Sequence, residues 1–117
     1  MPTLRDLVAV LRQREGVEAA VVLGRDGLLI DSDVQSAIDP ESMAALIPQI
    51  VAAGDEFGAS DGRGAIQTAI LEYQHGIAVI CILNQDAILL VLAQPSANLG
   101  SLLFELRRNR ANIAALV

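Results

Sequence analysis

The sequence predicts an α+β domain in which a five-stranded antiparallel sheet carries helices on both faces. Apolar residues make up 53% of the 117-residue chain and aromatic residues only 3%, against a usual apolar share of roughly 45–50%. Helix-like and strand-like apolar patterns follow one another in the order α-β-β-α-β-β-β-α. The chain shows neither a repeat nor a linker, so residues 1–117 are expected to form one domain with one core.

The first helix is expected over residues 4–14. Thr3 is a suitable N-cap, apolar residues follow with i, i+3, i+4, i+7 spacing, and Gly16 is placed to end the helix. The pattern indicates an amphipathic helix that lies with one side on the sheet.

An antiparallel hairpin follows this helix. Its strands are predicted over residues 17–23 and 28–32, and the tetrapeptide Gly24-Arg25-Asp26-Gly27 between them supplies glycines for a tight turn. The polar stretch 31–37 reads as a loop after the second strand.

The second helix is predicted over residues 40–57, because Asp39 is an N-cap, Pro40 occupies the first helical position and Glu41 places an acid in the first turn. Pro48 lies inside this helix, where a proline removes a hydrogen bond and costs about 3 kcal/mol or more. We expect a kink there, because the apolar stripe continues on both sides; the alternative is a break into two helices at Ile47.

Three strand-like runs come after the flexible, glycine-rich connector 58–64. They cover residues 65–72, 77–83 and 87–93 and are joined by segments of hairpin length, which predicts an antiparallel meander. The last two runs are apolar on both faces, so we expect them to be central strands covered by helices above and below.

The last helix is expected to begin with Ser96 as its cap and to place Leu99 and Ile113 on its buried face. Three arginines, Arg107, Arg108 and Arg110, stand in its C-terminal half. The helix dipole accounts for such a cluster, and binding of a partner's carboxylates is the alternative.

Net charge, cysteine content and the N-terminal sequence bear on the expected partners and location of the protein. The 14 acidic and 8 basic residues leave a net charge of −6, which disfavours nucleic acid as a partner. Cys81 is the single cysteine and lies in an apolar run, so a reduced, buried thiol and a cytoplasmic location are expected. The N-terminus lacks the pattern of a signal peptide, and no apolar run approaches the roughly 20 residues that span a bilayer, so membrane insertion is not expected.

The chain lacks the residue sets that most catalytic sites require. His75 is the only histidine and falls in a predicted hairpin turn, where a solvated role is expected. No cysteine or histidine pattern for zinc and no nucleophile elbow is present, and the glycines of segment 58–64 are not followed by the Gly-Lys-Ser/Thr of a phosphate loop. The acids Asp31, Asp33, Asp39 and Glu41 lack the alternation of a calcium loop. We therefore expect no catalytic residues, no bound metal and no cofactor.

The element order, together with residues 16–23 (GVEAAVVL) and 25–30 (RDGLLI), resembles the roadblock/LC7 family, and its MglB-like bacterial members in particular. The resemblance spans nearly the whole chain. It implies the sheet order 2-1-5-4-3, with the first and last helices on one face and the second helix on the other. It also implies a homodimer joined through the third strand, which is an edge, and through paired second helices.

The same resemblance implies a non-catalytic regulator or scaffold of a Ras-like small GTPase, whose switch regions would contact the paired second helices. The expected dimer residues are Met43, Leu46, Ile50, Ile66, Thr68 and Ile70. The candidate GTPase contacts are the polar positions beside the apolar stripe, namely Glu41, Gln49, Asp55 and Glu56.

Two alternatives stay open at the level of sequence. One is a structural adaptor or light chain that assembles a larger complex without dependence on nucleotide. The other is a small-molecule sensor, which needs an apolar pocket with a few convergent polar groups.

Overall fold

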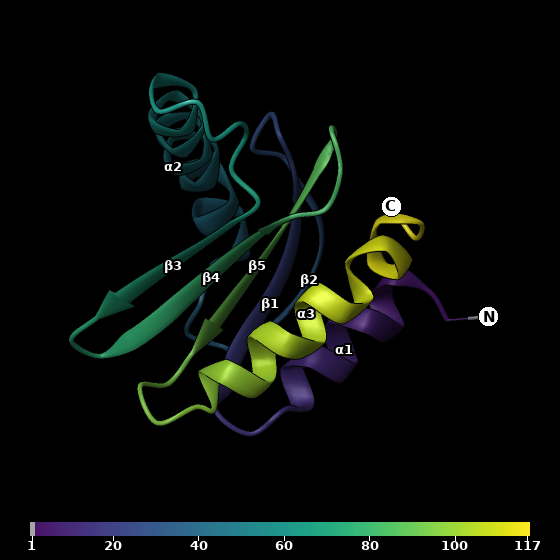
Figure 1. The fold of residues 1–117 in the computed structure, drawn as a ribbon. Coiled ribbons are helices and arrows are strands. Elements are labelled where there is room, and N and C mark those ends of the chain that lie inside the picture. The colour runs from purple at the N-terminus through teal and green to yellow at the C-terminus, as the bar shows by residue number, and fades with distance from the viewer. Residues whose placement is uncertain (1) are drawn as a thin grey trace.

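The computed structural model describes residues 2–117, which run through three helices and five strands in the predicted order (Figure 1). The elements are α1 (Leu4–Gln13), β1 (Val17–Gly24), β2 (Leu29–Val34), α2 (Pro40–Ser60), β3 (Thr68–Tyr73), β4 (Gly76–Ile82), β5 (Ala87–Ala93) and α3 (Leu99–Ala114). Thr3 caps α1 as predicted: its hydroxyl accepts the Asp6 N–H, and the Asp6 carboxylate accepts the Thr3 N–H in return.

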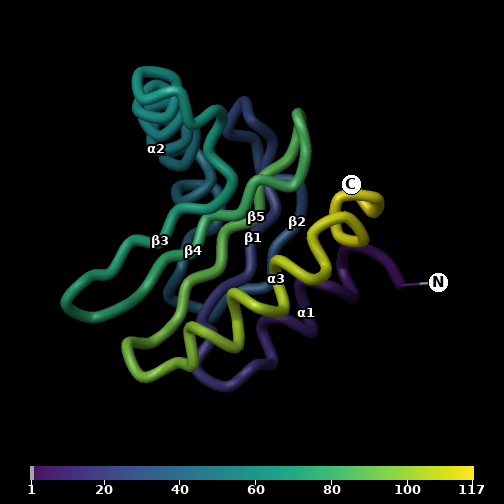
Figure 2. Tube along the Cα trace, viewed as in Figure 1, coloured from purple at the N-terminus to yellow at the C-terminus, as the bar shows by residue number. Residues whose placement is uncertain are grey.

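The strands form one sheet in the order β2-β1-β5-β4-β3, and every neighbouring pair is antiparallel. Helices α1 and α3 lie side by side on one face, and α2 lies on the other (Figures 1 and 2). The predicted fold class, sheet order and distribution of helices are therefore confirmed.

Each face of the sheet has its own apolar core because successive side chains of a strand point to opposite sides. On β5, Leu89 faces α1 and α3, whereas its neighbour Leu90 faces α2, and both side chains are fully buried. Burying a leucine contributes roughly 1.5–3 kcal/mol, so a strand that is apolar on both faces is stabilised only in the middle of such a sandwich. Strands β4 and β5 are central, as their unbroken apolar sequences predicted.

Strand β2 is longer than expected, and the prediction that the polar stretch from Asp31 begins a loop is wrong. Asp31, Ser32 and Asp33 pair with β1, which needs hydrogen-bond partners along its full length. An edge strand tolerates these polar side chains because solvent reaches them. Arg5 of α1 also holds the Asp31 carboxylate at 2.9 Å.

Helix α2 is continuous from Pro40 to Ser60, so the alternative of a break at Ile47 is wrong, whereas a kink at Pro48 stays a prediction. Burial on both sides of the proline keeps the helix on the sheet: Ala44, Ile47 and Val51 are all buried there. The proline ring also lies against the β1–β2 turn, with its Cγ 3.4 Å from the place that a Cβ on Gly27 would take. Gly27 has a φ of 86°, so the turn requires a glycine at this position for its backbone conformation in addition to the close approach of Pro48.

The C-terminal half of α2 is shaped by two glycines one turn apart. A Cβ on Gly54 would stand 2.4 Å from the Ile66 side chain, and a Cβ on Gly58 would stand 2.2 Å from the Gly64 carbonyl oxygen. The chain therefore returns toward the sheet in direct contact with the helix. This contact explains why α2 extends past the predicted end at residue 57 and why β3 begins at Thr68 instead of at residue 65.

The cap of α3 also differs from the prediction. Asn98, not Ser96, is the N-cap, and its Oδ1 accepts the Ser101 N–H at 3.0 Å. Asparagine caps helices as well as serine does. None of the helices in residues 2–117 is both long and apolar enough to cross a membrane.

Candidate protein-binding surface

The outer face of α2 exposes two large apolar side chains. Leu46 is 58% exposed and Phe57 is 73% exposed, and their spacing of 11 residues places them on the same side of the helix. Three exposed alanines and two exposed polar residues fill the rest of this face, which we call the outer α2 face: Ala45, Ala52, Ala53, Gln49 and Glu56. The three alanines on this face allow a second helix to approach closely.

The predicted dimer residues of α2 divide between this face and the core. Leu46 belongs to the outer α2 face, but Met43 and Ile50 are half-buried and pack against the core beneath the helix. Phe57 is exposed on the same face but is not among the expected dimer residues. Its helical spacing from Leu46 was the signal in the sequence that could have identified it as an interface residue.

Strand β3 forms the open edge of the sheet beside β4. The Ile82 N–H donates to the Gln67 carbonyl at 3.0 Å, which marks residues 67 and 82 as a hydrogen-bonded pair of the antiparallel ladder. Such pairs alternate with non-bonded ones, so the main-chain groups of Thr68, Ile70 and Glu72 point away from β4. These groups are the ones that a further strand would meet.

The structure separates the three predicted dimer residues of this region. Ile70 is 42% exposed on β3, and Thr68 starts the strand, with its hydroxyl accepting a hydrogen bond from Arg110 at 2.8 Å. Ile66 lies outside the strand and packs against Gly54 of α2, so its assignment to the edge strand is wrong. Because Gly54 has no side chain, Ile66 can pack against α2 before the strand begins.

Asp55 has contacts within the chain, unlike the other candidate GTPase contacts. Its carboxylate accepts the Ile66 N–H at 2.8 Å and lies 3.8 Å from the Arg25 guanidinium. It therefore joins α2 to the segment that enters β3 and to the β1–β2 turn. Glu41, Gln49 and Glu56 are exposed, and Gln49 and Glu56 lie two turns apart on the same side of α2.

The N-terminus of α2 is fixed by Asp39. Its carboxylate accepts hydrogen bonds from the Ser42 hydroxyl at 2.6 Å and from the Glu41 N–H at 3.1 Å. The Ser42 hydrogen bond lowers the pKa of Asp39 from its ordinary value of 3.8, and the backbone hydrogen bonds add to the effect. Asp39 is therefore ionised near neutral pH and stabilises the start of the helix that carries the surface.

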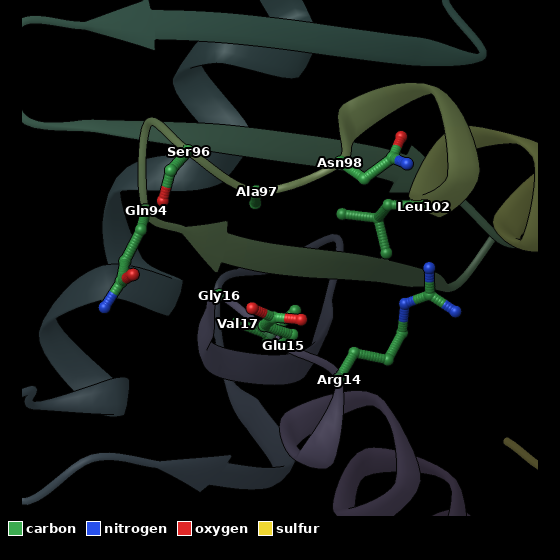
Figure 3. A pocket seen from close by; sticks show the side chains of 9 residues that line it. All are labelled: Arg14, Glu15, Gly16, Val17, Gln94, Ser96, Ala97, Asn98 and Leu102. Atoms are coloured by element: carbon green, nitrogen blue, oxygen red, sulfur yellow. The ribbon is translucent and has the colours of Figure 1, made fainter.

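A hollow of about 430 Å³ with a mixed polar and apolar lining lies between the α1–β1 turn and the β5–α3 connection (Figure 3). It is lined by Arg14, Glu15, Gly16, Val17, Gln94, Ser96, Ala97, Asn98 and Leu102. Arg14 is already held by Glu105 and by the Ser101 hydroxyl, each at 2.9 Å. Because five of these nine residues are polar, the hollow is not the predominantly apolar pocket that the small-molecule sensor hypothesis requires.

The groups considered for chemistry lie apart from one another. His75 is exposed in the β3–β4 turn, and Cys81 is buried under α3 as a free thiol. Across residues 2–117, no three His, Cys, Asp or Glu side chains gather as a metal site would require. The surfaces that stand out are therefore the outer α2 face and the β3 edge.

Comparison with known proteins agrees with this architecture. The family model described as Roadblock/LC7 domain matches residues 3–93. The uncharacterized protein MJ1340 of Methanocaldococcus jannaschii is 28% identical over 106 residues, which cover 91% of this chain and 92% of that protein. MglB of Myxococcus xanthus has a TM-score of 0.88 at 18% identity, over 97% of this chain and 93% of that chain.

A second solved structure, an MglB with tetrameric arrangement, has a TM-score of 0.86 at 14% identity, over 97% of this chain and 86% of that chain. These structural likenesses show the shared fold. Since the family model covers most of the sequence, and the sheet order and helix placement agree with it, the chain belongs to the Roadblock/LC7 domain family.

Proposed function

We propose that this protein is a non-catalytic homodimeric regulator or scaffold of a Ras-like small GTPase, and that it contacts the switch regions of the GTPase through paired α2 helices. The observation that carries the proposal is the outer α2 face, a long apolar helix surface that this fold leaves uncovered in the single chain. A free, buried cysteine suits a reducing compartment, so the proposal places the protein in the cytoplasm.

The β3 edge is the better of the two sheet edges for pairing with a second copy. The β2 edge carries Asp31 and Asp33, and its register is irregular between Val22 and Leu23; charges and irregularities of this kind oppose strand addition. Strand β3 carries one charged residue, Glu72, and its pairing with β4 is regular throughout. Antiparallel pairing of two β3 strands satisfies a two-fold axis and extends the sheet across both copies.

Paired α2 helices complete the proposed dimer. The contacts of Gly58 with Gly64 and of Asp55 with Ile66 place the C-terminal half of α2 beside the segment that enters β3. A two-fold axis at β3 therefore brings the two α2 helices toward each other, and Leu46 and Phe57 supply their apolar contacts. The tetrameric arrangement of one MglB supports self-association as a property of this fold.

The polar residues beside the apolar contacts form the proposed GTPase-binding positions. Glu41, Gln49 and Glu56 are exposed and make no hydrogen bond through their side chains to another described residue. A switch region changes conformation with the bound nucleotide, so the dimer influences the GTPase only as far as its affinity differs between the two nucleotide states. Asp55 contributes to this surface indirectly, through its internal contacts.

The test is affinity capture with the tagged protein from a lysate of the source cells, once with a non-hydrolysable GTP analogue and once with GDP. Recovery of a small GTPase with the analogue alone is the expected result. The Gln49→Ala, Glu56→Ala variant should lose that recovery. A matched control, Gln94→Ala with Glu15→Ala, removes the same two residue types from the hollow between the α1–β1 turn and the β5–α3 connection, and it should retain the recovery. Failure to recover a GTPase in either nucleotide state would contradict the proposal.

A structural adaptor is the second candidate function. The outer α2 face favours it in one respect, because Leu46 and Phe57 expose large apolar side chains, and permanent interfaces are richer in apolar surface than transient ones. Equal recovery of the same partner with both nucleotides, or recovery of a partner that is not a GTPase, would favour the structural adaptor over the GTPase regulator.

A further inference from the structure

Three arginines of α3 lack acidic partners in a protein that is rich in acid. The chain has a net charge of −6, and its ion pairs within 4.0 Å use Arg5, Arg14, Arg25 and Arg63. Within residues 2–117, none of Arg107, Arg108 and Arg110 has a carboxylate at that distance. Positive charge is therefore concentrated and unneutralised on one stretch of α3.

The helix dipole does not account for this cluster. Helix α3 continues to Ala114, and its last turn carries no basic residue. The dipole effect falls off within the last turn, so arginines at positions 107 and 108 lie too far from the end to benefit. The interpretation of the cluster as dipole pairing is therefore wrong.

Arg110 has a structural role of its own. Its guanidinium donates to the Thr68 hydroxyl at 2.8 Å and to the Gln67 carbonyl at 3.3 Å, which ties α3 to the start of β3. Arg107 and Arg108 make no hydrogen bond or ion pair to another residue of the described chain. They are the two arginines free to bind a partner.

The two free arginines stand next to exposed apolar surface. Phe104 is 64% exposed and lies one turn before them on the same side of the helix. Arg107 borders two adjoining hollows, one of about 500 Å³ shared with Arg110 and Thr68, and one of about 480 Å³ shared with Phe104 and Leu103. The result is one continuous surface with a basic part and an apolar part, which we call the α3 surface.

We propose that the α3 surface is a docking site for an acidic protein segment that carries apolar residues among its carboxylates. The arginine guanidinium groups offer paired N–H donors that match a carboxylate, and Phe104 with Leu103 receives the apolar side chains. Charge complementarity selects this occupant. Two free arginines on a protein of net charge −6 are too few for a phosphate backbone or an anionic membrane, each of which needs a larger basic cluster.

The α3 surface lies on the face of the sheet opposite α2 (Figures 1 and 2). A segment bound there leaves the outer α2 face accessible, and the hollow shared by Arg107 and Thr68 reaches the start of β3. The protein therefore has two separate places for partners, and binding at the α3 surface does not depend on the proposed GTPase contact.

The test uses a synthetic peptide with glutamate and leucine at helical spacing, titrated into the ¹⁵N-labelled protein and followed by amide chemical shifts. Shifts centred on residues 103–110 are expected, with affinity that falls as salt is raised from about 0.05 M to about 0.5 M. The Arg107→Glu, Arg108→Glu variant should bind about tenfold or more weakly. The charge-matched control Arg5→Glu, Arg63→Glu should bind as the wild type does.

A second pair of variants tests the apolar part without changing charge. Phe104→Ala should weaken peptide binding, and Val10→Ala, which truncates another exposed apolar residue on the helix layer, should not. Absence of shifts on α3, or equal binding by the Arg107→Glu, Arg108→Glu variant and the wild type, would overturn the proposal. So would tighter binding of the wild type to phosphatidylserine vesicles or to a short DNA duplex than to the peptide.

Discussion

Asp55 shows how one side chain connects the surface to the fold. Its carboxylate is the acceptor for the partly buried Ile66 N–H, and it also lies near Arg25. A buried donor that loses its acceptor keeps the cost of its lost hydration. We therefore expect Asp55→Ala to lower the free energy of unfolding in urea by about 1 kcal/mol, and Glu56→Ala, on the exposed side of the helix, to leave it unchanged. Equal effects of the two substitutions would contradict the assignment.

Gly58 is required by close packing within α2. A Cβ there would stand 2.2 Å from the Gly64 carbonyl oxygen, so Gly58→Ala forces the return segment away from the helix and should cost about 1–3 kcal/mol of stability. Gly100 is a matched control in α3, since the nearest atom to its added Cβ would be the Asn98 Oδ1 at 3.7 Å. Gly100→Ala should leave the free energy of unfolding unchanged or raise it by up to about 1 kcal/mol. Thermal unfolding of both variants measures the difference.

Asp39 makes the stability of α2 depend on pH in the acidic range. Its pKa in the folded chain is lowered below 3.8, chiefly by the Ser42 hydroxyl, so its contribution is fully present above the unfolded pKa and is lost as pH falls through the lower folded pKa. The difference in unfolding free energy between the wild type and Asp39→Ala should be constant above about pH 5 and shrink below pH 3.8. An unchanged difference in strong acid, measured by urea unfolding at several pH values, would show that the carboxylate is not the stabilising group.

At the scale of elements, strand β3 offers a substitution that separates folding from pairing. The Ile70 N–H points away from β4, so Ile70→Pro removes an outward donor and keeps the ladder to β4. We expect this variant to retain the circular dichroism spectrum of the wild type and to lose self-association in light scattering. Leu71→Pro is the control, because it removes a donor to β4 and should disrupt the strand itself. Retained association of a folded Ile70→Pro variant would exclude the β3 edge as the interface.

The elements that the sequence predicted well are those whose own residues decide their structure. Strands β4 and β5 are apolar throughout, and α2 begins with an N-cap and a proline, so local chemistry alone identified them. The cap of α3 was missed although it is local, since the Asn98 side chain accepts the Ser101 N–H. Two other details depended on distant residues: the length of β2 is determined by pairing with β1, and the position of Ile66 by Gly54. Tertiary contacts of this kind leave no signal in a short window of sequence.

At the scale of the whole molecule, strand order and exposed surfaces are properties that local patterns do not contain. The order β2-β1-β5-β4-β3 was predicted through the family resemblance, not through periodicity. Leu46 was expected at the dimer interface through the family resemblance, whereas the exposure of Phe57, which its spacing from Leu46 could have indicated, was found only once α2 was placed on the sheet. The same holds for Arg107 and Arg108, whose lack of acidic partners becomes evident only in the folded chain.

The whole molecule is proposed to act as a homodimer, and every functional role assigned to the outer α2 face depends on that state. The most direct test is the molar mass of the native protein at micromolar concentration, measured by light scattering during size-exclusion chromatography. The chain has a mass of 12.3 kDa, and the account predicts a single species of twice that value. A species of 12.3 kDa at all concentrations tested would contradict the paired α2 helices and the GTPase-binding surface built on them.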